Sequence, residues 1–297
     1  MLIREILALE TDQPNSHPDI LGDPFLMLHN PVYRQVKTQA LRMGCQYREA
    51  WPEYLLLPFF QLKKIVASKT IPYVPNARLA RELEQEKPGL LNLQNFNVPE
   101  SYHLHESAHV IADALFAQVP LGGAEERILK ALSCESFANT VDALVFLAAD
   151  SETHQNLVQL SSYMRPDPED IAVLSRLHRE LGSRATFLLT FFAYLSANFL
   201  GDGFSEESVN SIATLYLGGE KLSARQKEDA LQIGQMAEKL DPLFRVQTTE
   251  VYFKFEGIEG DLHDVLNFSF MRMFNARPDL AKIPEQMAAV LNPVRPA

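Results

Sequence analysis

The sequence predicts a mainly helical protein with a small amount of β-sheet, and three observations support this. Apolar residues recur at helical spacing through most of the chain. Capping residues or prolines precede many of these segments, and glycines or prolines often follow them. The alternation that is typical of a strand is found in two short segments, residues 91–98 and 249–255. The apolar content of 46% in 297 residues is enough for a sizeable core.

In the N-terminal half, turn and capping residues mark the ends of the expected helices. Asn30 and Pro31 suit the N-cap and the first position of the first helix, and Gly44 suits its C-terminal end. Pro58 would break or kink the second helix. We expect helices here over residues 32–43, 51–67, 77–87, 102–118 and 124–149.

The C-terminal half continues in the same pattern. We expect further helices over residues 168–182, 184–200, 205–217, 223–240, 263–274 and 282–291. The segment Pro166-Asp167-Pro168 suits a boundary between two subdomains, residues 1–165 and residues 166–297. The most apolar stretch, residues 185–200, is uncharged but shorter than the roughly 20 residues of a membrane span. We therefore expect it to be a buried core helix.

Composition excludes some classes of partner. With 27 basic and 38 acidic residues, the net charge of −11 argues against nucleic-acid binding, which requires a basic surface. The sequence has no basic cluster that would bind an anionic membrane. Two cysteines cannot form a disulfide framework, and the N-terminal residues lack the pattern of a signal peptide. These features predict a cytoplasmic protein, and they leave its oligomeric state open.

The most informative motif is His105-Glu106-Ser107-Ala108-His109, which has the H-E-x-x-H pattern. Residues four apart share one face of a helix, so His105 and His109 can direct their imidazole nitrogens at one ion. Zinc binds such nitrogens at about 2.0–2.1 Å, and a catalytic site needs a third protein ligand and a water. Glu106 is placed to accept a proton from that water as general base. The alternative is that both histidines lie on a solvated helix face.

The candidate third ligand is Glu135, in an unusually apolar part of the helix expected over residues 124–149. Helical spacing puts it on one stripe with Ile128, Ala131, Ala138 and Asp142. A buried carboxylate needs a metal, a cation or several hydrogen-bond donors. Glu135 therefore suits a metal ligand, or else a carboxylate that pairs with an arginine in a cleft.

The region 101–142 resembles the gluzincin group of zinc metallopeptidases. In that group the third ligand is a glutamate on the helix that follows H-E-x-x-H, often within E-x-x-S-D. Here Glu135 matches, but Ala138 and Asn139 replace the serine and the aspartate. In this family the aspartate holds a ligating histidine. Asn139 can make the same contact through its carbonyl oxygen, and Asp142 is the alternative. The resemblance implies a zincin-like helix pair in residues 1–165 and one zinc ion per chain.

The resulting functional hypothesis is a zinc-dependent hydrolase of the metallopeptidase type with a peptide or protein substrate. Two other classes stay open: a non-heme di-iron oxidase, and a non-catalytic protein that keeps the zincin helices. The oxidase would need more carboxylates, with Glu49, Glu53, Glu135 and Asp150 as candidates. Other residues considered are the rival ligands His103 and His154 and the oxyanion-stabilising candidates Tyr163, Tyr194 and Arg165.

Overall fold

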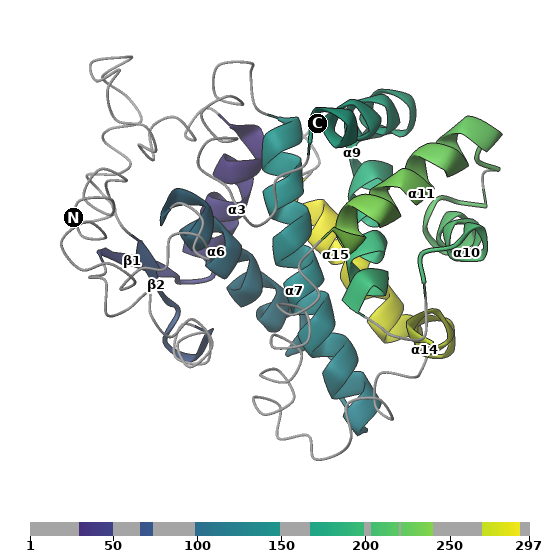
Figure 1. Ribbon diagram of the computed structural model, residues 1–297. Coiled ribbons are helices and arrows are strands. Elements are labelled where there is room, and N and C mark those ends of the chain that lie inside the picture. Colours follow the sequence, from purple (N-terminus) through teal and green to yellow (C-terminus); the bar gives the residue numbers. More distant parts are fainter. Residues whose placement is uncertain are drawn as a thin grey trace, which may run out of the picture. The chain divides into compact units, whose positions relative to one another are not determined.

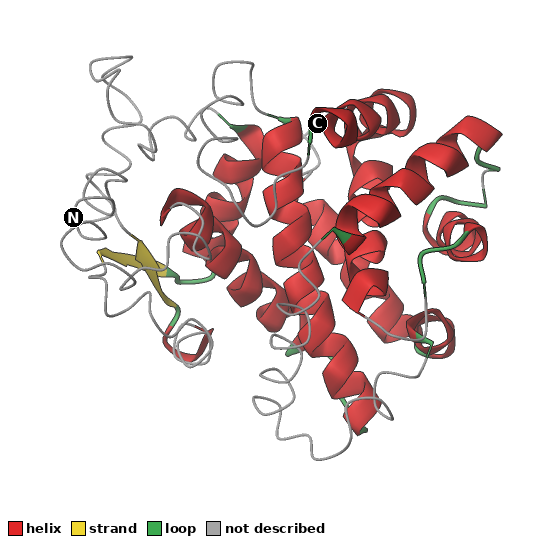
Figure 2. Ribbon diagram, in the orientation of Figure 1, coloured by secondary structure: helices red, strands yellow, loops and turns green. Residues whose placement is uncertain are grey.

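The computed structural model describes residues 30–49, 66–73, 99–148, 167–198, 203–219, 221–239 and 269–291. In these residues the fold is mainly helical, which confirms the predicted class (Figures 1 and 2). Its helices are α3 (Pro31–Arg42), α6 (Pro99–Phe116), α7 (Ala124–Leu147), α9 (Pro168–Asn198), α10 (Glu206–Tyr216), α11 (Ala224–Glu238), α14 (Phe270–Ala276) and α15 (Pro278–Leu291). The two strands are β1 (Gln46–Glu49) and β2 (Thr70–Tyr73).

The chain divides into two compact units. The first comprises residues 1–111 and 141–165, and the second comprises residues 112–140 and 166–297. The sequence suggests a single boundary, between residues 165 and 166. The segment 112–140, however, belongs to the second unit, so α6 and α7 are each continuous across the division.

The strands of the first unit are ones that the sequence analysis did not predict. β1 and β2 pair in parallel, with Gln46 opposite Thr70 and Glu49 opposite Tyr73. Each strand has four residues, too few for an alternation of apolar and polar side chains to stand out. The predicted strands 91–98 and 249–255 and the helix 77–87 lie outside the described residues, as does most of the helix 51–67.

Asn30 links the start of α3 to the last turn of α7. Its side-chain oxygen accepts hydrogen bonds from the amides of Val32 and Tyr33, at 3.1 and 3.2 Å, as an N-cap does. Its side-chain nitrogen donates to the carbonyl of Val145 at 2.8 Å. Val145 is one of the last four residues of α7, so no backbone amide within the helix donates to its carbonyl. One buried amide side chain thus forms hydrogen bonds with both helix ends.

We expect Asn30→Ala to lower the free energy of unfolding by roughly 2 kcal/mol, because it removes the cap and the donor to Val145. Asn30→Ser should cost about half as much, because serine also caps helices but is too short to reach that carbonyl. Urea denaturation followed by circular dichroism measures both values. Equal losses for alanine and serine would contradict a capping role for Asn30.

In the second unit, α9 consists of two helical segments joined at Gly182. This glycine has φ 80° and ψ 172°, in the left-handed region that glycine tolerates best. The break coincides with the junction that the sequence predicts between residues 182 and 184. After it, every side chain from Phe187 to Leu195 is buried. Phe187 packs edge-to-face on Phe137 of α7. The predicted core helix is therefore confirmed.

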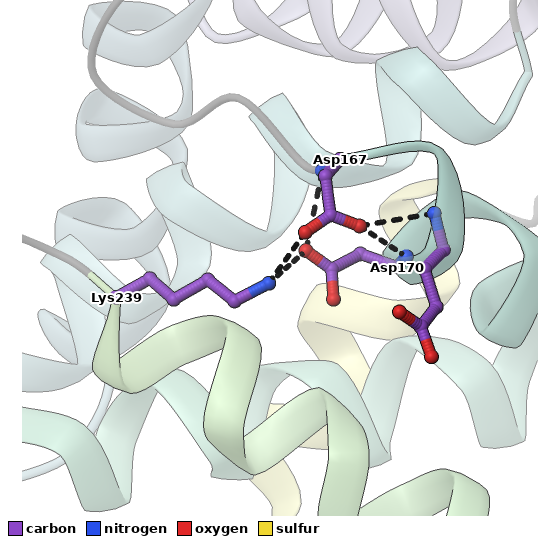
Figure 3. Close-up of polar contacts among 4 residues, drawn as sticks. Asp167, Asp170 and Lys239 are labelled. Atoms are coloured by element: carbon purple, nitrogen blue, oxygen red, sulfur yellow. Dashed lines mark hydrogen bonds and ion pairs between the residues drawn. The ribbon is translucent and has the colours of Figure 1, made fainter.

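Ion pairs attach α11 to the first segment of α9. Arg176 makes a two-pronged contact with the buried Asp229, at 3.2 and 2.8 Å. At the C-terminal end of α11, the Lys239 ammonium contacts the carboxylates of Asp167 and Asp170, at 2.7 and 2.8 Å (Figure 3). Asp167 also caps α9, and its hydrogen bond from Lys239 lowers the pKa of its carboxyl. The Lys239 contacts hold the N-terminal end of α9 against the C-terminal end of α11, and the Arg176 contact joins the two helices further along α9.

The remaining helices differ from the prediction only at their ends. α10 and α11 begin after the N-caps Ser205 and Ser223. α15 begins at Pro278, four residues before the predicted start, because proline suits the first helical position. α14 covers only the C-terminal part of the predicted helix 263–274, whose earlier residues lie outside the described part. None of the described helices has the length and apolarity needed to cross a membrane.

Candidate metal centre

The two histidines of the H-E-x-x-H motif lie one turn apart on α6. Their ring centroids are 4.8 Å apart and the rings meet edge-to-face. The helix buries most of its surface here, and His109 and Glu106 are only 3% and 4% exposed. The side chain of His105 is 21% exposed, so the motif is reached by solvent at this residue. A solvated helix face therefore does not describe this part of α6.

α7 supplies the third side chain. Glu135 is 5% exposed, and the potential ligand atoms of His105, His109 and Glu135 all lie within 4.8 Å of one another. Within the described part of the chain, this is the one group of three or more histidine, cysteine or acidic residues with metal-binding spacing. The three residues that the sequence proposes as ligands are thus close together.

The donor set fits zinc. Two imidazoles and one carboxylate are among the ligand sets of catalytic zinc sites, which keep a fourth position for water or substrate. Ligand atoms around a tetrahedral zinc ion lie about 3.3 Å apart, as follows from bonds of about 2.0–2.1 Å. The separations here are at most 4.8 Å. The chemistry and spacing of the three donors are compatible with one zinc ion.

Asp142 of α7 contacts the first histidine. Its Oδ2 lies 2.8 Å from Nδ1 of His105, and its side chain is 10% exposed. A carboxylate at Nδ1 holds the ring so that Nε2 is the nitrogen available to a metal. The sequence offers both Asn139 and Asp142 for this role. The contacting residue is Asp142, and Asn139 lies buried one turn after Glu135.

Of the other residues considered from the sequence, the structure describes the side chain of Tyr194 alone. Tyr194 is 2% exposed in the apolar segment of α9. Glu49 ends β1 and His103 lies in α6, but their side chains are outside what the structure describes. Tyr163, Arg165, His154, Glu53 and Asp150 lie outside the described residues altogether.

An ion pair between α6 and α7 was missed by the sequence analysis. Lys130 Nζ lies 2.7 Å from Asp113 Oδ1, with the two side chains 18% and 29% exposed. Asp113 follows His109 by four residues, so helical spacing places it on the stripe of His105 and His109. That spacing is the signal that could have identified it.

Comparison with known proteins adds no relative to this description. No protein-family model, no curated protein and no solved structure matches the chain.

Proposed function

We propose that this protein is a zinc-dependent hydrolase of the metallopeptidase type, which cleaves a peptide or amide bond. The observation that carries the proposal is the grouping of His105, His109 and Glu135 within 4.8 Å, next to the buried Glu106. The four residues have the identities and the order along the chain of the gluzincin motif. The contact between Asp142 and His105 adds the carboxylate that commonly orients a zinc-binding histidine.

In the proposed reaction, bound zinc supplies a water of lowered pKa and polarises the carbonyl of the substrate. His105, His109 and Glu135 would hold the ion. Glu106 would accept a proton from this water as the water oxygen attacks the carbonyl carbon. When the carbon–nitrogen bond breaks, Glu106 gives this proton to the leaving amine. The products are a carboxylic acid and an amine.

The donor set supports this function over a di-iron oxidase. Di-iron sites in helical bundles use carboxylates from several helices together with two E-x-x-H pairs. The metal-binding group in the described residues contains one glutamate and two histidines. Such a set suits one ion.

Metal analysis tests the proposal. We expect the purified protein to bind about one zinc ion per chain, and His109→Ala and Glu135→Ala to lose most of it, because two ligands hold zinc far more weakly than three. His178→Ala is the matched control, because this exposed histidine of α9 should not affect binding. Inductively coupled plasma mass spectrometry after dialysis gives the stoichiometry. Zinc retention in Glu135→Ala would reject Glu135 as a ligand, and two irons per chain would support the oxidase.

A further inference from the structure

Two polar side-chain contacts join α6 and α7. The first contact joins His105 of α6 to Asp142 of α7, and the second joins Asp113 of α6 to Lys130 of α7. From the first contact to the second, the position moves forward by eight residues along α6 and back by twelve residues along α7. These two contacts show that the helices run antiparallel, and the short connection of residues 117–123 agrees with this direction. The group of His105, His109 and Glu135 lies in the stretch between these two contacts.

The offset between two helices controls the distance between donors that come from different helices. His105 and His109 are both on α6, so the helix itself fixes their separation. Glu135 is on α7, and sliding one helix along the other by one residue would move it by about 1.5 Å. A zinc ligand has to lie within a few tenths of an ångström of its ideal distance. The contacts on either side of the donor group are placed to limit such sliding.

Asp113 and Lys130 form the contact that does not touch a candidate ligand. Their separation of 2.7 Å is that of a charge-assisted hydrogen bond, and both side chains are mostly removed from solvent. Asp113 lies one turn beyond His109, and Lys130 lies five residues before Glu135. The pair thus connects the two helices next to the donors.

We propose that Asp113 and Lys130 are positioning residues of the metal centre. Their ion pair sets the offset of α7 along α6 and so holds Glu135 at bonding distance from a metal bound by the two histidines. This inference rests on the proposed zinc site. It concerns the metal affinity and coordination geometry of that site, and it assigns the pair no part in the chemical step.

The test compares the zinc affinity of the wild type with Asp113→Asn, Lys130→Met and the charge-reversed pair Asp113→Lys with Lys130→Asp. Competition with a chromophoric chelator gives the affinity, and visible absorption of the cobalt-substituted protein reports the coordination geometry. We expect each single variant to bind zinc about three- to fivefold more weakly, the range that a partly exposed ion pair supports. The reversed pair should recover wild-type affinity to within about twofold and restore the cobalt spectrum.

The control is Lys227→Met, which removes an ion pair of similar length, with Glu206, in the second unit. It should leave both zinc affinity and the cobalt spectrum unchanged. Unaltered affinity in both single variants, or a reversed pair as weak as they are, would overturn the positioning role while leaving the zinc site standing. A wild-type protein that binds no zinc would overturn the proposed function and this inference together.

Discussion

Replacement of Glu106 by glutamine should reduce hydrolysis by at least about a hundredfold while zinc stays bound. Glutamine has nearly the shape of glutamate, but its amide cannot accept the proton of the attacking water. A positioned general base contributes roughly 10²–10⁴-fold to the rate. Glu106 is not one of the three donors that lie together, so its loss should leave the stoichiometry near one zinc per chain. A fluorescence-quenched peptide library gives kcat/KM, and metal analysis of the same samples gives the zinc content.

Glu125→Gln is the control for this substitution. Glu125 is an exposed residue in the first turn of α7, so the same change of charge there should leave kcat/KM within about twofold. Wild-type protein that holds zinc but cleaves no member of the library, or Glu106→Gln protein that is as active as wild type, would contradict the proposed role. The first of these results would favour the alternative of a zincin-like protein that binds a partner without catalysis.

The helices were predictable because their signals are local. Asn30 with Pro31, Ser205 and Ser223 mark helix starts through the preference of N-caps for short polar side chains, and all three cap helices in the structure. The pair of β1 and β2 was not predictable in this way. A parallel pair depends on contacts between residues more than twenty positions apart, and four residues carry too little periodicity to reveal it.

The candidate site shows the same division between local and non-local information. His105, Glu106 and His109 lie within five consecutive residues, so their relation follows from the geometry of one helix. Glu135 could be proposed because a carboxylate among apolar residues demands a partner. The choice between Asn139 and Asp142 depends on how far α7 is displaced along α6, which neither helix encodes by itself. The contact between Asp113 and Lys130 depends on the same displacement.

Asp142→Asn should weaken zinc binding by roughly 10–100-fold, the usual effect of losing the group that orients a zinc-binding histidine. Asparagine has the size of aspartate, but it lacks the charge that raises the basicity of His105. Asp142→Ala should weaken binding at least as much, because Nδ1 of His105 then loses its 2.8 Å contact. Chelator competition measures the affinities, and circular dichroism shows whether α6 and α7 remain folded.

Asn139→Ala is the matched control, because Asn139 lies on α7 only three residues before Asp142. The antiparallel direction of the helices explains why the later residue contacts His105. Moving from His109 back to His105 on α6 corresponds to moving forward from Glu135 on α7, and Asp142 lies two turns forward whereas Asn139 lies only one. Asn139→Ala should therefore keep zinc affinity within about threefold. If it weakens binding more than Asp142→Asn does, the residue at the family's aspartate position is the one that orients the histidine.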